Sequence, residues 1–319
     1  MKKLLAIMLS FVMVFSLASC GGGSQTEGAA EPEEEVIEEE LQYPGNNENF
    51  KYNVYDKHVE IIGYCGKPNK EELVVPATIE DLPVTEITRA ENADYVDGIF
   101  GEFKGKKIVF EDGIEEIHSL YFGGNESLKE IVLPSTLKFA PRAFEDCNAL
   151  EKVTIPEGIE KIYDGMFAEC DGLKHVVLPS TVTEISTEGF AYCDSLSDIK
   201  LNEGLTKIGE SAFSGCLLLE NIALPKSLES IGEFAFCDTT LEEVKLYENV
   251  NVVEADIFFD CFELRDVWVY NPDLVSVDGD NIIESLDEVD ASKLTIHGKA
   301  KSTAAKMAAE EGFLFKVIK

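Results

Sequence analysis

The sequence has few of the residues from which catalytic sites are usually built. Its 319 residues include only four histidines, and these lie far apart at His58, His118, His175 and His297. It also lacks a G-x-S-x-G segment, an H-E-x-x-H segment and a phosphate-binding glycine loop. We therefore expect no enzymatic activity, no bound metal and no cofactor.

Positive charge is scarce as well. The chain has 27 lysines and arginines against 61 aspartates and glutamates, which gives a formal net charge of -34. So acidic a surface repels phosphate groups, and this excludes nucleic acid and anionic lipid as expected partners.

Long hydrophobic runs are also missing. The apolar stretch at residues 4–17 follows Lys2 and Lys3 and is too short to be a firm candidate for a membrane span. Leu17-Ala18-Ser19-Cys20 comes next, and the segment resembles a bacterial lipobox. The resemblance implies that residues 1–19 are a lipoprotein signal peptide and that Cys20 carries the lipid. An ordinary cleaved signal peptide is the alternative.

Residues 20–42 have the composition of a tether. Glycine is frequent at the start, and glutamate follows in two runs at 33–35 and 38–40. Like charges extend such a segment. We expect a disordered spacer that holds the rest of the chain away from the membrane, although an acidic ligand for a basic partner is also conceivable.

The rest of the chain is dominated by an internal repeat. Phenylalanine recurs every 23 residues at Phe144, Phe167, Phe190, Phe213 and Phe236. Nine residues after each of these phenylalanines, or eight after the last, begins a short alternating pattern that predicts a strand. The first inward residues of the regular repeats are Ile108, Ile131, Val153, Val176, Ile199, Ile222, Val244 and Val267. A period in the twenties indicates leucine-rich repeats that stack their strands into one parallel sheet over a continuous core.

One repeat shows the whole pattern. It reads Ile159-x-x-Ile162-x-x-x-x-Phe167-x-x-Cys170-x-x-Leu173-x-x-Val176-x-Leu178-Pro179. This unit resembles the BspA-like leucine-rich repeat of bacterial surface proteins, and the match covers residues 52–319. The resemblance implies an α/β-type repeat solenoid with a parallel sheet on one face.

The solenoid is expected to occupy residues 43–319. An N-terminal β-hairpin cap is predicted at 43–72, where the strands are 50–55 and 59–63. The repeats follow at 73–270, with an inserted loop around residues 89–106. A C-terminal strand-helix-strand cap is predicted at 271–319, with a helix over 302–311 that Ser302 caps and Gly312 ends.

Six cysteines follow or nearly follow the same period. Cys147, Cys170, Cys193, Cys216 and Cys261 keep the register, whereas Cys237 is displaced. No C-x-x-C pair is present, so metal binding is not expected. We interpret these cysteines as small buried residues. Neighbouring thiols in a ladder are nevertheless close enough for some disulfides, so this possibility stays open.

One row of the predicted sheet points outward. It consists of Val109, Val132, Thr154, Val177, Lys200, Ala223, Lys245 and Trp268. The row is mostly apolar or cationic, which is unexpected in an acidic protein and is typical of a binding face. Strand propensity alone also explains such residues. The candidate ligand-binding residues are Trp268, Lys245, Lys200, Val177, His175, Thr154 and Val132.

Trp268 is the only tryptophan and is the most distinctive member of this row. Tryptophan is enriched at binding hot spots, and it also stacks on sugar rings. The alternative is that residues 273–292 cover its ring.

The combined expectation is a monomeric binding or adhesion module. It would be anchored through Cys20 on the extracellular side of the cell membrane or at the cell surface, and it would recognise an extracellular protein or glycan through the repeat sheet. A passive structural spacer of the cell envelope is the alternative.

Overall fold

The computed structural model describes residues 40–88, 99–118, 126–274 and 293–318. These residues belong to one compact unit, Glu39–Lys319. The predicted signal peptide, Cys20 and most of the predicted tether lie outside the described residues, as do much of the predicted inserted loop and most of residues 273–292.

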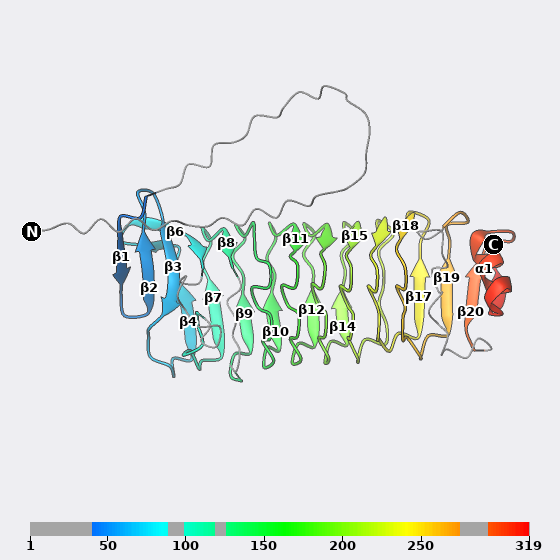
Figure 1. Cartoon of the computed structure of the whole chain (residues 1–319), viewed down its shortest axis with the longest axis horizontal. Helices are drawn as coiled ribbons and strands as arrows, with labels where there is room; N and C mark the ends of the chain where they lie inside the picture. The colour runs from blue at the N-terminus through cyan, green and yellow to red at the C-terminus, as the bar shows by residue number, and fades with distance from the viewer. Residues whose placement is uncertain (1–39, 89–98, 119–125, 275–292, 319) are drawn as a thin grey trace, which may run out of the picture. The chain divides into compact units, whose positions relative to one another are not determined.

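The described residues form a solenoid whose strands stack in the order of the sequence (Figure 1). Six parallel strands make the first part of one ladder: β4 (Glu72–Val75), β7 (Lys107–Phe110), β9 (Glu130–Val132), β10 (Lys152–Thr154), β12 (His175–Val177) and β14 (Asp198–Lys200). Four parallel strands continue it: β17 (Glu243–Leu246), β19 (Asp266–Val269), β20 (Thr295–Gly298) and β21 (Leu314–Val317). We call these two sheets together the first ladder. The predicted parallel sheet is thereby confirmed.

The register of the first ladder matches the repeat in the sequence. Val153 pairs with Ile131, Val176 with Ile199 and Val244 with Val267, each across one repeat. All eight residues predicted to point inward are buried, with exposures between 0% and 8%. The long first repeat also obeys this register, because Leu73 pairs with Ile108 despite the extra residues between them.

The first ladder is interrupted at one repeat. Where a strand of the first ladder is expected between β14 and β17, the described residues form only an isolated bridge, from Asn221 to Glu243. Ile222 and Leu224 are still buried. The sequence therefore predicted the direction of these side chains correctly, while the regular strand expected at this repeat does not form.

A second, narrower parallel ladder runs beside the first. Its strands are β11 (Lys161–Ile162), β13 (Glu184–Ile185), β15 (Lys207–Ile208), β16 (Ser230–Ile231) and β18 (Val252–Val253). In Figure 1 these short strands follow the upper part of the stack, and the first ladder follows the lower part. The repeats of β10, β12 and β14 thus each contribute two strands, and no helix lies between β4 and β19 among the described residues, which refines the expected repeat architecture.

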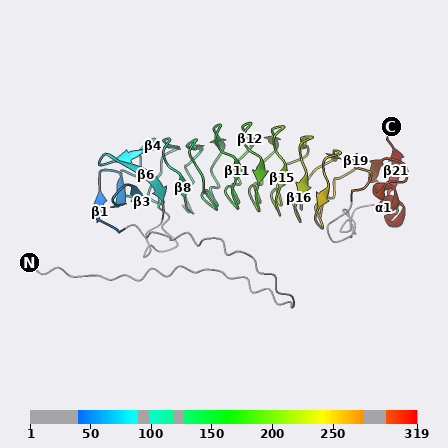
Figure 2. The same cartoon turned by 90° about the horizontal axis from the view of Figure 1, so that it is seen from above.

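The phenylalanines form the centre of the core. The rings from Phe144 to Phe258 stack on one another, with centroids 5.5–5.9 Å apart between successive repeats. Each of these rings is at most 1% exposed. Since every ring is covered by the rings of the repeats on either side, the core is continuous along the stack seen from above in Figure 2.

The periodic cysteines serve the packing of these phenylalanines. The thiol of Cys193 donates a hydrogen bond to the carbonyl oxygen of Phe167 at 3.2 Å, and that of Cys216 does the same to Phe190. Cys147, Cys170, Cys193, Cys216 and Cys261 are buried, and Cys237 is half-buried. All six are free thiols in the part of the chain that the structure describes, and the five that keep the register are buried, as interpreted from the sequence.

Both ends of the described stack carry distinct elements. At the N-terminal end, β1 (Tyr43–Asn46), β2 (Phe50–Val54) and β3 (Val59–Tyr64) form an antiparallel meander, so the predicted hairpin gains a third strand. The first repeat adds β5 (Thr78–Ile79) and β6 (Leu82–Ile87), and the repeat of β7 adds β8 (Glu116–Ile117). β6 pairs in parallel with both β3 and β8.

At the C-terminal end, α1 (Thr303–Glu311) connects β20 to β21. The side chain of Ser302 accepts a hydrogen bond from the backbone amide of Ala305, and Gly312 ends the helix in a left-handed conformation. No helix within the described ranges is long and apolar enough to cross a membrane.

Candidate functional site

The predicted ligand-binding residues all lie on the first ladder, but the structure divides them into two groups. Val132, Thr154, Val177 and Lys200 belong to the outward row of the first sheet, and Val177 is 61% exposed. Lys245 and Trp268 are partners in β17 and β19, in the four-stranded sheet of the first ladder. His175 occupies a neighbouring row, where its Nδ1 lies 3.6 Å from Asp198.

Trp268 is held between two side chains of neighbouring strands. The imidazole of His297 stacks on the indole with ring centroids 4.2 Å apart and planes 10° apart. The ammonium group of Lys245 lies 5.0 Å from the indole centroid. Lys245 and His297 are the ladder partners of Trp268 on opposite sides, so both faces of the indole are covered. Trp268 is half-buried and presents its edge rather than a free face.

Two tyrosines extend this arrangement into the next row. Tyr247 and Tyr270 directly follow β17 and β19, and their rings stack with centroids 5.5 Å apart. The ammonium group of Lys226 lies 5.6 Å from the Tyr247 centroid. We call Lys226, Lys245, Tyr247, Trp268, Tyr270 and His297 together the aromatic–cationic patch.

Two carboxylates hold Lys245 and His297 of the aromatic–cationic patch in place. Glu243 accepts a hydrogen bond from Lys245 at 3.0 Å, and this contact raises the pKa of the Lys245 ammonium group. Asp266 lies 2.6 Å from Nε2 of His297. Glu243 lies in the same strand as Lys245, and Asp266 lies in the strand next to that of His297. The two carboxylates therefore position Lys245 and His297 on either side of Trp268.

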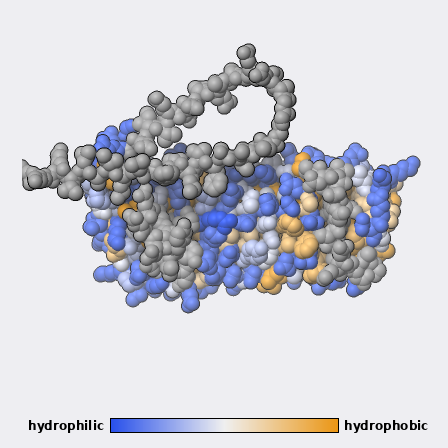
Figure 3. Space-filling view, in the orientation of Figure 1, coloured by the Kyte–Doolittle hydropathy of each residue, from blue (hydrophilic) through white to orange (hydrophobic). Residues whose placement is uncertain are grey.

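A hollow adjoins the aromatic–cationic patch where the first ladder is interrupted. It has a volume of about 210 Å³ and lies between residues 221–224 and the side chains of Glu243, Lys245 and Tyr247. Ala223 is too small to fill the outward position of its repeat. Figure 3 shows that the N-terminal part of the viewed face is mostly hydrophilic, whereas apolar residues gather towards the C-terminal half.

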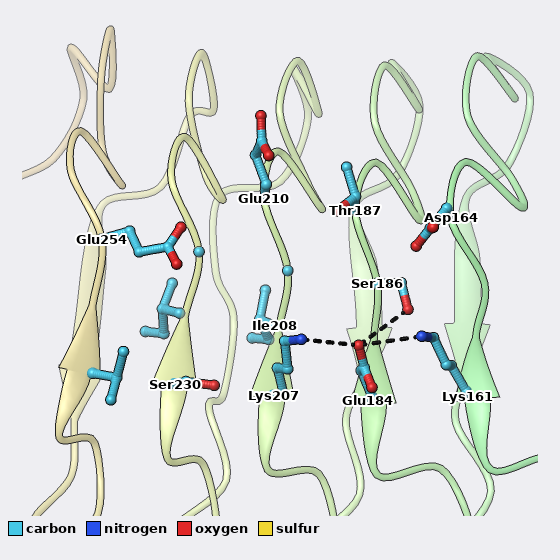
Figure 4. A pocket seen from close by; sticks show the side chains of 14 residues that line it. Lys161, Asp164, Glu184, Ser186, Thr187, Lys207, Ile208, Glu210, Ser230 and Glu254 are labelled. Carbon is cyan, nitrogen blue, oxygen red and sulfur yellow. Dashed lines mark hydrogen bonds and ion pairs between the residues drawn. The ribbon is translucent and has the colours of Figure 1, made fainter. Parts of the chain in front are cut away.

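A second hollow, of about 310 Å³, lies on the second ladder (Figure 4). Small residues follow three of its strands, at Ser186, Gly209 and Gly232. A Cβ atom at Gly232 would lie 2.5 Å from the backbone nitrogen of Glu210, so only glycine fits there. Because charged and polar side chains make up most of its lining, this hollow offers less apolar contact than the aromatic–cationic patch.

One carboxylate in the wall of the second hollow is paired with two lysines of the protein. Glu184 lies 3.4 Å from the ammonium group of Lys161 and 3.2 Å from that of Lys207. Burial alone would raise the pKa of Glu184, but the contacts with the two lysines outweigh it and lower that pKa. The three side chains therefore form a self-contained ion-pair network.

Sequence reasoning missed four members of the aromatic–cationic patch, namely Lys226, Tyr247, Tyr270 and His297. Tyr247 and Tyr270 are 23 residues apart and could have been found by extending each strand by one position. His297 was hidden because the residues before β20 break the period. Aligning Leu294-Thr295-Ile296-His297 with Arg265-Asp266-Val267-Trp268 would have placed it beside Trp268.

Solved structures show the same fold. The chain resembles a leucine-rich repeat protein from Bacteroides ovatus, with 21% identity, a TM-score of 0.54, and coverage of 86% of this chain and 77% of that one. It also resembles a leucine-rich cell surface protein from Faecalibacterium prausnitzii, with 20% identity, a TM-score of 0.51, and coverage of 82% and 71%. No curated protein matches the chain.

The family model for the BspA-type leucine-rich repeat region matches residues 96–216 and 138–265, with six copies of the repeat. Together these matches span more than half of the chain. The chain belongs to the BspA-type leucine-rich repeat family.

Proposed function

We propose that this protein is a binding or adhesion module of the bacterial cell surface that recognises an extracellular ligand through the first ladder. BspA-type repeats form a family of bacterial surface proteins, and leucine-rich repeat solenoids are typically non-enzymatic scaffolds for binding or structure. The observation that carries the proposal is the aromatic–cationic patch with its adjoining hollow. Clustered aromatic side chains and lysines on an acidic molecule are better explained by recognition than by solubility.

The covered faces of Trp268 favour a protein ligand over a glycan. A sugar ring stacks on a free aromatic face, and both faces of this indole are occupied by Lys245 and His297. The edges of Trp268, Tyr247 and Tyr270 remain for contact, together with their hydrogen-bonding atoms. Rigid aromatic side chains of this kind contact a protein surface at a low cost in conformational entropy.

Cys20 is proposed as the lipid attachment point, with residues 20–42 as the spacer between the membrane and the repeats. The support is the sequence Leu17-Ala18-Ser19-Cys20 after an apolar stretch. Because the repeats begin after this acidic segment, the first ladder would be displayed away from the membrane. We expect no nucleic-acid partner and a monomeric chain, and the ligand-free alternative is a passive spacer of the cell envelope.

A capture experiment tests the proposal. Residues 42–319, immobilised as a soluble fragment, would be exposed to extracellular-matrix and mucus fractions, and the bound component would then be titrated against the fragment. We expect saturable binding that the double change W268A/Y270A weakens and the matched change K161A/K207A on the second ladder leaves intact. Absence of saturable binding would favour the spacer, and equal binding by both variants would exclude the aromatic–cationic patch.

A further inference from the structure

Three glutamates occupy consecutive positions at the N-terminal end of the stack. Glu60 of β3, Glu86 of β6 and Glu116 of β8 are Cα partners across neighbouring parallel strands. The strands β6 and β8 are seen side by side in Figure 1. Like charges on directly opposed strand positions destabilise a sheet. This row of glutamates therefore requires a source of positive charge or of hydrogen-bond donors.

The second ladder shows how the same fold supplies that charge elsewhere. Glu184 lies between its ladder partners Lys161 and Lys207 and contacts both (Figure 4). The charges alternate along the row there. Among the described residues, no lysine or arginine pairs with Glu86 or Glu116. Within the described ranges the N-terminal row thus lacks the lysines that its counterpart contains, and the basic side chains that act on Glu86 are those of His58 and His118.

The first of the three glutamates is satisfied by the protein itself. Glu60 accepts hydrogen bonds from the Asn53 amide at 2.8 Å, from the Tyr55 hydroxyl at 3.0 Å and from the Thr88 hydroxyl. The side chain of Glu86 is half-buried, and its carboxylate makes no hydrogen bond or ion pair within the described ranges. Glu86 is therefore the member of the row whose carboxylate has no partner within the described ranges, since Glu116 contacts His118.

A histidine completes this cluster. His118 lies two residues beyond Glu116, and its Nε2 is 3.3 Å from Oε2 of that residue. Its ring packs against Phe139 with centroids 5.3 Å apart, which restricts its orientation. One side-chain ligand atom from each of Glu86, Glu116 and His118 lies within 4.8 Å of the other two. Two carboxylates and one imidazole converge on a single point from two paired strands.

We propose that Glu86, Glu116 and His118 bind a divalent transition-metal ion, for which Zn²⁺ is best suited. Imidazole nitrogen and carboxylate oxygen are both ordinary zinc ligands at about 2.0–2.2 Å. The observed spacing allows all three atoms to reach one ion after small rotations of the side chains. The ion supplies the positive charge that Lys161 and Lys207 supply to Glu184. Three protein ligands leave a fourth position open for water or for an oxygen atom of a bound partner.

Calorimetric titration of residues 39–319 with Zn²⁺ alone tests the proposal. We expect one site per chain, with an affinity that falls at least about tenfold in E86Q and in H118A, because removing a ligand should cost no less than removing an outer-shell partner. The matched controls E184Q and H175A keep the wild-type affinity. Weak binding at many sites that E86Q and H118A leave unchanged would overturn the proposal, since an acidic chain binds cations non-specifically.

A charge reversal at Glu86 provides a second test, with thermal stability rather than binding affinity as its readout. E86K would place an ammonium group between Glu60 and Glu116. The charges would then alternate along this row, as they do along the row of Lys161, Glu184 and Lys207. Zn²⁺ should raise the melting temperature of the wild-type fragment, since a ligand that binds only the folded state stabilises it. It should not raise the melting temperature of E86K. An equal rise in both proteins would contradict a site built on Glu86.

Discussion

The imidazole of His297 lies flat against the indole of Trp268, with the two ring centroids 4.2 Å apart. The two residues are 29 positions apart in the sequence but are direct partners in neighbouring strands. The stack in the first ladder therefore presents a paired aromatic surface rather than an isolated tryptophan. A ligand that docks here meets ring edges, hydroxyl groups and ammonium groups held in a fixed row.

This stack predicts the fluorescence of Trp268, the only tryptophan in the chain. We expect intermediate acrylamide quenching in the wild-type protein, because the ring is half-buried. H297A should uncover one face, shift the emission to longer wavelength and increase the quenching. H175A is the matched control, since His175 lies in another row. Identical quenching in wild type and H297A would contradict the stacked arrangement.

The phenylalanine stack predicts the largest losses of stability. Phe190 is fully buried between Phe167 and Phe213, so F190A should lower the free energy of unfolding by about 3–5 kcal/mol. Phe262 is 53% exposed, so F262A should change the free energy of unfolding little. Denaturant unfolding of the two variants measures the difference. Equal stabilities would mean that the repeated phenylalanine does not form the core.

The buried thiols predict a difference in chemical reactivity. Burial raises the pKa of the Cys193 and Cys216 thiols well above the ordinary value, and that of Cys261 to about 11. Since the thiolate is the reactive form, these residues should resist thiol reagents in the folded fragment from residue 42. Cys65 is exposed and should react first. Mass spectrometry after labelling, with and without denaturant, separates the buried thiols from the exposed one. C65S should remove the labelling that occurs without denaturant. Rapid labelling of Cys193 in the folded state would be inconsistent with this core.

Carboxylates that bridge neighbouring repeats predict a loss of stability in acid. Glu157 accepts hydrogen bonds from the Ser180 amide and hydroxyl, and Asp112 accepts the same pair from Ser135. These bonds lower the pKa of both carboxyl groups. A lowered pKa in the folded state means that the ionised form stabilises the fold, and that this stabilisation is lost as the pH falls through the folded-state pKa.

E157Q should therefore flatten the fall in melting temperature between about pH 6 and pH 3, where carboxyl groups titrate. E220Q is the control, because the carboxylate of Glu220 has no hydrogen bond within the described ranges. If both variants reproduce the wild-type pH curve, the contact between Glu157 and Ser180 does not contribute to stability.

The repeat pattern made most of the fold accessible to sequence reasoning. The positions of Phe167 and Val176 are repeated at a fixed spacing along the chain, and each repeat buries the side chains at these positions. The inward direction of nearly all these side chains therefore followed from the period. The interruption at Asn221–Leu224 was not predictable, because Ile222 and Leu224 keep the pattern while the backbone loses its pairing. The spacing of apolar residues predicts which side chains are buried, whereas the hydrogen bonds between strands also depend on the backbone of the neighbouring repeats.

The candidate site was predicted only in part for a related reason. Trp268 and Lys245 could be placed on the outward row by counting, but their contact with each other and with His297 depends on side-chain conformation across strands. The convergence of Glu86 with Glu116 and His118 was hidden because the long first repeat disrupts the period. Contacts that cross an irregular repeat require the structure.

The most direct test of the central claim is hydrogen exchange in the fragment of residues 42–319, with and without saturating amounts of the captured ligand. We expect the ligand to increase the protection of backbone amides from exchange in residues 221–224, in β17 and in β19, where the aromatic–cationic patch and its hollow lie. W268A/Y270A should abolish this added protection at the same ligand concentration. Protection confined to the second ladder or to the N-terminal meander would contradict recognition through the first ladder.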